Sequence, residues 1–349
     1  MRSNQSYLVC IRCSTYNHAP YIVDALNGFT MQQTSFPYIA MVVDDASTDG
    51  EQEVITSYVD KYFDLNDQDV AYQEETDYAH ITYAQHKTNK NCYIVVLLLK
   101  ENHYQSGRNS KKIGYLATWR DYAKYEAICE GDDYWIDPLK LQKQVDFLEA
   151  NPEYGMCYTN FNIFYQDANR TIEDVFTTHS KKFPIKYNSA EEFVLKGGYV
   201  CPPSWVFRRE FLPKSTIKSV DGTFVLFTHF LCTTKVYGMI DTTTIYRVLS
   251  ESASHSLDYN KLYKREKGLL ETQYKLIDEY NLDNSLKRKC EELHYKRCLP
   301  GFVANNKTID IQIAERKIIN KAFREQILFL LSRFRLGRNA FGAIYRLLK

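Results

Sequence analysis

An acidic stretch in the first half of the chain is the strongest candidate for chemistry. A short apolar run ends at Cys129 and is followed by Glu130, Gly131, Asp132 and Asp133. Carboxylates crowded at the end of a buried strand repel one another unless a cation neutralises them. Oxygen ligands suit Mg²⁺ or Mn²⁺, which proteins hold with one or two carboxylates together with substrate phosphates. The stretch therefore predicts a divalent-metal site facing a phosphate, with a solvated acidic turn as the alternative.

Two further strand-like runs end in polar residues that could complete such a site. Apolar runs cover residues 7–13 and 39–43, and a polar loop follows each of them at once. Each loop alone is equally well explained as a turn. In open α/β sheets, however, ligands bind just outside the carboxyl ends of the strands, so we expect the three strand ends to line one nucleotide-binding crevice. The residues concerned are Thr15, Tyr16, Asn17, Asp44 and Asp45.

The elements that must position these residues alternate between strand and helix patterns. Residues 93–99, 126–129 and 155–165 also have strand patterns, and apolar residues three and four apart predict helices between the strands. This alternation predicts a doubly wound, mostly parallel α/β sheet flanked by helices. Residues 64–92 give no clear pattern, and the chain from residue 261 onward is predicted to be all-helical.

Composition narrows the class of protein. The 349 residues carry 44 Lys and Arg against 43 Asp and Glu, a net charge of +1, so no overall field favours nucleic acid. Nine cysteines without a repeating spacing suit buried thiols in a reducing cytosol, and only Cys10 and Cys13 form a close pair. The N-terminus lacks the apolar core of a signal peptide, and no stretch approaches a membrane span. A cytoplasmic protein is therefore predicted.

Four segments of the chain resemble glycosyltransferase family 2, the inverting enzymes of GT-A fold. They are S-T-Y-N-H-A-P-Y-I from residue 14, V-V-D-D-A-S-T-D-G from 42, I-C-E-G-D-D-Y-W-I-D-P-L-K-L-Q-K-Q-V from 128, and Y-R-V from 246. Their order and spacing agree with the family over residues 6–250. No glycine-rich dinucleotide or P-loop motif competes with this assignment. The resemblance implies a nucleotide-sugar donor and a divalent cation, Mn²⁺ or Mg²⁺.

The resemblance also implies roles for the three strand ends. The first-strand motif lies against the base, and the second Asp of the V-D-D motif contacts the nucleoside. The D-x-D metal motif corresponds to Glu130-Gly131-Asp132, with Asp133 beside it. Glu130 departs from the usual Asp, so it is assigned to the ribose or to a metal-bound water, and Asp132 and Asp133 to the metal. The base and nucleoside positions fall on Thr15, Tyr16, Asn17 and Asp45.

Two roles fall in the second half of the chain. An inverting transfer needs a general base that deprotonates the acceptor hydroxyl. The family places an Asp at the start of a helix after the W-x-F-R-R block, and the carboxylate available there is Asp221, with an N-cap as the alternative. Arg247 of the Y-R-V segment resembles the basic residue that meets the diphosphate, with a surface salt bridge as the alternative. The family's His two residues later is Leu249 here, and His255 is the nearest substitute.

Residues 323–349 form a basic, aromatic-rich end. Six cations face the single acid Glu325, and apolar residues recur at helical spacing. Such a segment suits an anionic membrane surface, and a helix that packs back on the protein or on a second subunit is the alternative. Gly337 and Gly342 predict two helical pieces instead of one.

The sequence as a whole predicts an inverting, metal-dependent glycosyltransferase. Residues 1–255 are expected to form the GT-A domain, with the nucleotide half at 1–135 and the acceptor half at 136–255, and residues 256–349 a helical extension. The donor is a nucleoside-diphosphate sugar with UDP favoured, and the acceptor is a hydroxyl of a glycan or lipid-linked glycan at the inner face of a bacterial plasma membrane. The rivals are a nucleotide-sugar-binding scaffold and a nucleotidyl hydrolase or transferase. A homo-oligomer is left open.

Overall fold

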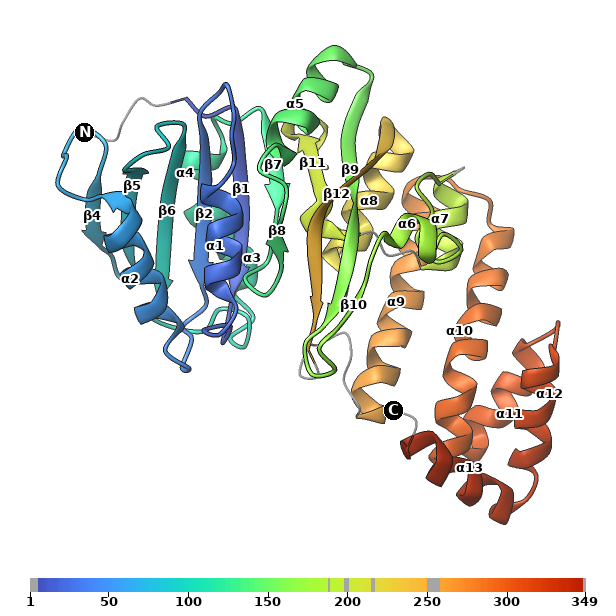
Figure 1. The fold of residues 1–349 in the computed structure, drawn as a ribbon. Coiled ribbons are helices and arrows are strands. Elements are labelled where there is room, and N and C mark those ends of the chain that lie inside the picture. Colours follow the sequence, from blue (N-terminus) through green and yellow to red (C-terminus); the bar gives the residue numbers. More distant parts are fainter. Residues whose placement is uncertain (1–5, 188, 198–200, 215–216, 250–257, 348–349) are drawn as a thin grey trace. The chain divides into compact units, whose positions relative to one another are not determined.

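The computed structural model describes residues 6–187, 189–197, 201–214, 217–249 and 258–347 (Figure 1). Its internal contacts divide the chain into two compact units. The sheet unit contains Met1–Lys186, Val200–Leu212 and Thr233–Val248, and the helical unit contains Tyr187–Tyr199, Pro213–Cys232 and Leu249–Lys349. The predicted boundary at residues 255 and 256 lies outside the described residues, so it stays a prediction.

The sheet unit is built on one twelve-stranded sheet. Its centre is the parallel set β6–β2–β1–β7, and β9 and β12 also pair in parallel, whereas the other pairings are antiparallel. From one edge the strands are β3 (Phe63–Asp64), β5 (Ala79–His86), β6 (Cys92–Leu99), β2 (Tyr38–Asp44), β1 (Val9–Thr15), β7 (Tyr125–Ile128), β11 (Trp205–Arg208), β9 (Tyr154–Tyr165), β12 (Lys235–Val248) and β8 (Tyr134–Trp135), with β4 (Tyr72–Glu75) on β5 and β10 (Arg170–Ile172) on β9.

Alternating side chains of the parallel strands fill two separate cores. In β1, Val9, Ile11 and Cys13 belong to one cluster, whereas Cys10 belongs to another. The first cluster includes α1 (Ile22–Thr30), α2 (Glu51–Tyr62) and α5 (Lys140–Ala150), and the second includes residues from α3 (Asn109–Tyr115) and α4 (Ala117–Arg120). A strand buried on both faces reads as a continuous apolar run, which is why the sequence predicted these strands well. A short α6 (Val175–Thr178) packs on β9.

The helical unit has its own apolar core, formed where α10, α11 and α12 pack together. Leu299, Phe302 and Val303 of α10 are fully buried in this core. None of the described helices is long and apolar enough to cross a membrane. The helices are α7 (Ala190–Lys196), α8 (Gly222–Thr233), α9 (Tyr259–Glu279), α10 (Ser285–Ala304), α11 (Thr308–Lys317), α12 (Phe323–Ser332) and α13 (Arg335–Leu347).

The basic C-terminal end forms two helices, as predicted, but its glycines do not mark the break. The helices separate between Ser332 and Arg335, and Gly337 and Gly342 both lie inside α13. A Cβ on Gly342 would lie 2.7 Å from the backbone oxygen of Ala304, so this glycine allows α13 to pack closely on α10. Gly342 is therefore explained by the close packing of α13 on α10, and not by a break between two helices.

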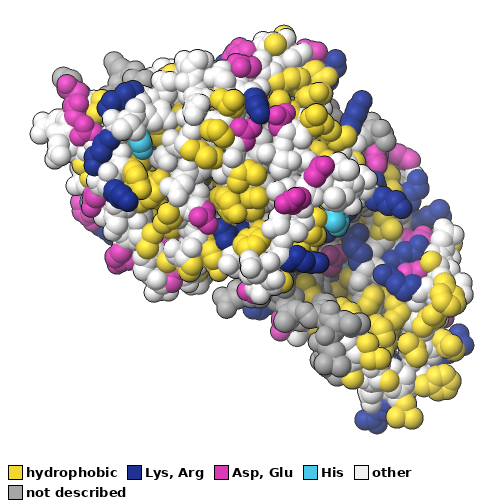
Figure 2. Space-filling view, viewed as in Figure 1, with side chains coloured by type: hydrophobic (Ala, Val, Ile, Leu, Met, Phe, Trp, Pro, Cys, Tyr) yellow, Lys and Arg dark blue, Asp and Glu magenta, His cyan; other side chains and the backbone are white. Residues whose placement is uncertain are grey.

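The same two helices also expose apolar and cationic side chains together. Leu328 and Phe329 are buried in the helical core, whereas Phe323 is 77% exposed and Leu336 is 84% exposed. Figure 2 shows hydrophobic side chains interspersed with Lys and Arg over this end of the chain. The segment therefore packs back on the protein with one side and presents an amphipathic surface with the other. The other exposed apolar residues are Ile327, Leu330, Phe334 and Ile344.

A buried lysine gives the sheet unit a pH-dependent stability. Lys140 at the start of α5 is fully buried, and burial lowers its pKa to about 8. An unfolded lysine keeps its proton up to a pKa of about 10.4. Between these values the unfolded state binds more protons, so this residue's contribution to stability rises with pH.

We expect Lys140→Met to abolish this pH dependence. The free energy of unfolding of the wild type, minus that of the variant, should rise between about pH 8 and pH 10 by up to about 3 kcal/mol, because each pKa unit corresponds to about 1.4 kcal/mol. Urea unfolding at several pH values measures the difference. Taking the difference between the two proteins removes the contribution of the buried Cys and Tyr residues to the pH dependence, because both proteins contain them. A pH-independent difference would show that burial does not lower the pKa of Lys140, so that the folded protein keeps the lysine protonated.

Candidate functional site

The three polar strand ends predicted from the sequence lie together in the sheet unit. The backbone N–H of Asp45 donates to the carbonyl of Thr15 at 3.0 Å, and that of Gly131 donates to the carbonyl of Ser14 at 3.2 Å. A Cβ on Gly131 would lie 2.1 Å from Thr15 Oγ1, so only glycine allows the acidic loop this close to the end of β1. The loops after β1, β2 and β7 therefore form one continuous edge, which is called the nucleotide edge after its predicted ligand.

Glu51, the first residue of α2, is buried and hydrogen-bonds with the loops after β1 and β2. Its carboxylate accepts a hydrogen bond from the hydroxyl of Thr15, and it also accepts the backbone N–H of His18 at 2.9 Å and the hydroxyl of Ser47 at 2.9 Å. Burial raises the pKa of Glu51, although these donors oppose the shift. The hydroxyl of Thr15 is therefore used in a hydrogen bond within the protein. Only the backbone and the methyl group of Thr15 remain to contact a nucleobase.

Asn17 connects the first two loops. Its backbone is left-handed, with φ of 56°, a conformation that Asn tolerates better than most residues. Its side-chain oxygen accepts the backbone N–H of Thr48 at 2.8 Å, and its own N–H donates to Ser47 Oγ at 2.9 Å. Tyr16 is half-buried and Asn17 is exposed. Of the three predicted base contacts, Tyr16 thus offers an aromatic face, and Asn17 fixes the loop that presents it.

Asp45 is buried and holds a distant loop in place. One carboxylate oxygen accepts the backbone N–H of His103 at 2.8 Å, and the other accepts that of Tyr104 at 3.1 Å. Lys112 Nζ lies 2.7 Å from the same carboxylate. Its neighbour Asp44 has one buried oxygen, Oδ2, without a hydrogen-bond partner among the described residues. Asp45 therefore joins the loop after β6 to the nucleotide edge, a role additional to the predicted nucleoside contact.

Asp133 is the most perturbed carboxyl of the acidic loop. It is 3% exposed, and its Oδ1 accepts the backbone N–H of Arg247 at 2.7 Å. Burial raises its pKa well above the usual value, and the charges of Asp132 and Glu130 raise it further. A divalent cation beside these acids would relieve this repulsion, so the electrostatics of the loop fit the predicted metal.

Arg247 at the end of β12 is buried, and the salt bridge considered from sequence is present, since it pairs with the half-exposed Asp24. Its guanidinium donates to the backbone oxygen of Asp132 at 2.8 Å, to the carboxylate of Asp24 at 2.6 Å and to the side chain of Gln166. The ring of Tyr21 lies 4.7 Å away. Arg247 thus anchors the acidic loop to α1 and to the segment after β9, and its diphosphate contact stays a prediction.

Asp132 and Glu130 are the less enclosed acids of the loop. Asp132 Oδ2 lies 4.0 Å from His18 Nε2, and its side chain is 19% exposed. Among the described residues, three potential ligand atoms converge within 4.8 Å only at Glu266, His294 and Cys298 in the helical unit. The acidic loop does not form such a cluster among the described residues, so the metal assignment of Asp132 and Asp133 stays a prediction, which would need a phosphate to complete the ligand set.

Asp221 lies in the helical unit, just before α8. Its Oδ1 accepts the backbone N–H of Phe224 at 3.0 Å and the hydroxyl of Thr223 at 2.7 Å. Its Oδ2 lies 3.3 Å from the guanidinium of Arg265. These contacts are those of a helix N-cap, the alternative raised for this residue, and its role as a base stays a prediction. His255 lies outside the described residues.

Sequence reasoning missed three side chains that organise this edge. The residues singled out from the sequence include none of the three, which are Glu51, Lys112 and Asp24. Glu51 could have been found, because an acid at the first turn of a helix directly after a D-x-S-T-D-G loop can accept hydrogen bonds from that loop. The pairing of Lys112 with Asp45 and of Asp24 with Arg247 had no sequence signal.

Comparison with solved structures gives the same fold. TarS residues 1–349 of S. aureus, in complex with UDP-GlcNAc, aligns with 98% of this chain and 92% of that chain, with a TM-score of 0.53 and 14% identity. The fold is that of TarS. A TarS structure in complex with UDP gives a TM-score of 0.51. These matches confirm the predicted α/β fold with a C-terminal helical extension.

Sequence comparison finds relatives for only part of the chain. Uncharacterized proteins of Mycobacterium tuberculosis and Mycobacterium bovis are 32% identical over 164 residues, which is 46% of this chain. The matched part covers 36% of the length of those relatives. No family model matches the chain. Membership of glycosyltransferase family 2 therefore stays a prediction.

Proposed function

We propose that this chain is an inverting, metal-dependent glycosyltransferase that uses a nucleoside-diphosphate sugar, with UDP as its nucleotide. The observation that carries the proposal is the joining of three polar strand ends at one edge, where Gly131 packs against Thr15. The fold adds support, because TarS shares it and has been solved with UDP-GlcNAc and with UDP. Ligands of α/β sheets bind at this edge.

In the proposed reaction the acceptor oxygen attacks the anomeric carbon while the bond from that carbon to the diphosphate breaks. The proton of the acceptor hydroxyl passes to a carboxylate base, for which Asp221 is the candidate. Tyr16 and the backbone after β1 contact the nucleobase of the donor, and Asp45 holds the loop after β6 in place. Asp132 and Asp133 would hold a divalent cation, which supplies charge neutralisation of the leaving diphosphate.

Donor turnover in the presence of Mn²⁺ tests the proposal. Purified protein is incubated with UDP- and GDP-sugars, and the nucleotide products are separated by anion exchange. Formation of nucleoside diphosphate supports glycosyl transfer or donor hydrolysis. Nucleoside monophosphate would instead indicate a nucleotidyl hydrolase, and tight UDP binding without turnover would indicate a binding protein. Thermal stabilisation by each nucleotide-sugar then identifies the donor, because a ligand that binds the folded state raises its stability.

Asp221→Asn is expected to separate binding from transfer. Asn keeps an oxygen that can cap α8 but cannot take up the acceptor proton, so transfer should fall by about 10²–10⁴-fold while UDP binding is unchanged. Arg265→Gln is the matched control, because it removes only the ion-pair partner of Asp221. Full transfer by Asp221→Asn would leave this residue as a helix cap and assign the base elsewhere.

We further propose that α12 and α13 bind an anionic membrane surface near a lipid-linked acceptor. Exposed Phe323 and Leu336 beside Arg333 and Arg335 supply the apolar and cationic contacts that such a surface attracts. Replacement of Phe323 and Leu336 by Ser should abolish flotation with vesicles containing 30 mol% anionic lipid (about a third, a typical test composition). Ile309→Ser, an equally exposed position on α11, is the control. Equal flotation of all three proteins would remove this role.

A further inference from the structure

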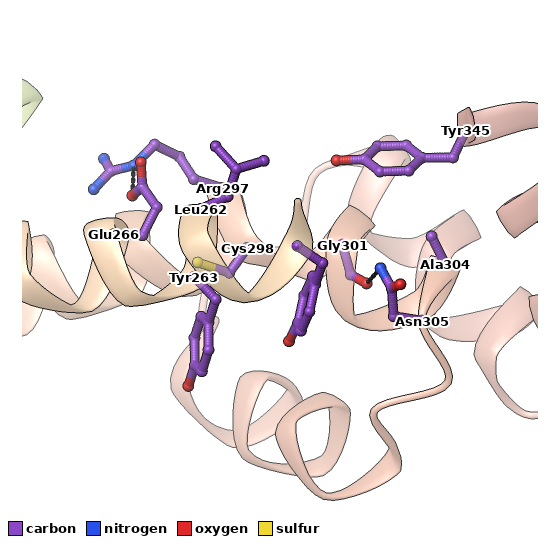
Figure 3. Close-up of a pocket in the computed structure, with 10 residues that line it drawn as sticks. Leu262, Tyr263, Glu266, Arg297, Cys298, Gly301, Ala304, Asn305 and Tyr345 are labelled. Carbon is purple, nitrogen blue, oxygen red and sulfur yellow. Dashed lines mark hydrogen bonds and ion pairs between the residues drawn. The ribbon is translucent and has the colours of Figure 1, made fainter. Parts of the chain in front are cut away.

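A cavity of about 440 Å³ lies within the helical unit, between α9, α10 and α13. Figure 3 shows Glu266 and Arg297 at one end of the residues that line it, and Tyr345 and Asn305 at the other. The volume is in the range of ligand sites, which are clefts of about 300–1,000 Å³. None of the residues assigned to the nucleotide edge lines this cavity, so it needs an explanation of its own.

Tyrosine rings dominate the wall. Tyr259 and Tyr263 stand one turn apart on α9, and their rings are nearly parallel, with an interplanar angle of 12° and centroids 5.9 Å apart. Phe302 packs edge-on against Tyr263, with a centroid distance of 5.2 Å, and so supports that ring. A Cβ on Gly301 would lie 3.3 Å from the ring of Tyr259, so this glycine leaves room for the ring against α10. Tyr345 of α13 adds a third ring.

Polar groups are placed around these rings. Glu266 of α9 and Arg297 of α10 form an ion pair of 2.9 Å at one end, and Asn305, whose amide donates to the carbonyl of Gly301 at 2.8 Å, lies at the other end (Figure 3). The hydroxyl of Tyr259 is buried and has no hydrogen-bond partner among the described residues. Burial also raises the pKa of Tyr259. Because this hydroxyl is buried, it does not face the open cavity, and polar contacts to a ligand fall to the other polar groups of the lining.

The wall excludes several classes of ligand. Among the described lining residues the acid Glu266 and the base Arg297 are paired, so these side chains leave no net charge for a phosphate or an ammonium group. Leu262 and Ala304 are the only aliphatic side chains among the lining residues, which is poor for a lipid chain. Glu266 also belongs to the His294–Cys298 cluster, but its carboxylate is already neutralised by Arg297, so no ion is required there.

We propose that this cavity binds an uncharged sugar unit. A sugar ring combines an apolar face, which packs on an aromatic ring, with hydroxyls that both donate and accept hydrogen bonds. The Tyr263 and Tyr345 rings supply the apolar contacts, and Glu266, Arg297 and Asn305 supply the polar ones. The site is a second carbohydrate site on the chain. Its link to a glycan acceptor rests on the proposed function, whereas the binding itself does not.

Saturation-transfer NMR on the full chain tests the site without any donor. The probes are methyl β-glucoside, methyl N-acetyl-β-glucosaminide and maltotriose, and UDP is measured in the same samples. We expect at least one glycoside to bind, and Tyr263→Ala and Glu266→Gln each to weaken that binding at least about tenfold while UDP binding is kept. Tyr274→Ala is the control, because Tyr274 lies on α9 but does not line the cavity.

The outcomes separate this proposal from the proposed function. Glycoside signals that persist in both cavity variants, or no glycoside binding at millimolar concentration, would overturn the sugar site whatever UDP does. Absence of UDP-sugar turnover by the wild type, with intact glycoside binding, would overturn only the transferase assignment. Binding of decanol in place of the glycosides would show that the cavity is a lipid site. Thermal unfolding of each variant confirms that the helical unit is folded, and Glu266→Gln keeps the size of the side chain if Tyr263→Ala fails to fold.

Discussion

Asp132→Asn should lower metal-dependent transfer by at least about 10²-fold, because even partners outside the ligand set of a metal typically contribute 10–100-fold. The variant keeps the size of the side chain and leaves the backbone oxygen of Asp132 free to accept Arg247. The measurement is the rate of nucleoside diphosphate formation as Mn²⁺ is titrated. If saturating Mn²⁺ restores activity, the variant binds the metal more weakly. If it does not, the rate of the transfer step itself is lower.

Two companion variants make the result specific. In Asp133→Asn the side-chain oxygen can still accept the backbone N–H of Arg247, so loss of activity with unchanged thermal stability would assign a metal role to Asp133. Asp146→Asn changes an exposed acid of α5 and should have no effect. Transfer by Asp132→Asn that still responds fully to Mn²⁺ would exclude Asp132 as a ligand.

Gly131→Ala should disrupt the nucleotide edge through packing alone. The added Cβ would lie 2.1 Å from Thr15 Oγ1 and 2.6 Å from Thr15 Cβ, so β1 and the acidic loop must separate. Overpacking of this kind costs about 1–3 kcal/mol, and the displaced loop should lose UDP binding. Urea unfolding and UDP titration measure the two effects.

A matched glycine and a double variant test the cause. A Cβ on Gly114 of α3 meets nothing within 4 Å, so Gly114→Ala should be neutral or stabilising. Thr15→Ala removes the nearer clash but keeps the contact between the two Cβ atoms, so combining it with Gly131→Ala should recover only part of the lost stability. Wild-type UDP affinity in Gly131→Ala would contradict the close packing of the two loops.

The sequence predicted the strands of the parallel core because each is buried on both faces and reads as an unbroken apolar run. It also predicted that the loops after β1, β2 and β7 would meet, since adjacent parallel strands end at the same edge. It failed over residues 64–92, where the exposed strand β4 and half-polar β5 pair as antiparallel neighbours. Tyr, Gln and Glu at these positions suit an exposed strand and a loop equally well.

The side-chain partners of the site were the least predictable part. Asp45 and Lys112 are 67 residues apart and Asp24 and Arg247 are 223 apart, and no periodicity relates such positions. The family resemblance predicted which residues contact the ligand, but it did not predict which neighbouring side chains hold those residues in place. The polar groups of Asp45, Arg247 and Thr15 form hydrogen bonds with segments that are distant in the sequence. These structural roles can therefore be recognised only in the folded chain.

The contacts of Arg247 also determine when, during synthesis of the chain, the acidic loop can be held in its folded position. This one side chain joins Asp24 of α1, the backbone of Asp132 and Gln166, and its own N–H holds Asp133. During synthesis from the N-terminus, the acidic loop is made more than a hundred residues before the arginine that secures it. The central strands can pair earlier, but the acids stay without their anchor until β12 has left the ribosome. A nascent chain that stalls before residue 247 therefore carries the acidic loop without its Arg247 contacts, and under the proposed function it would not yet bind the donor.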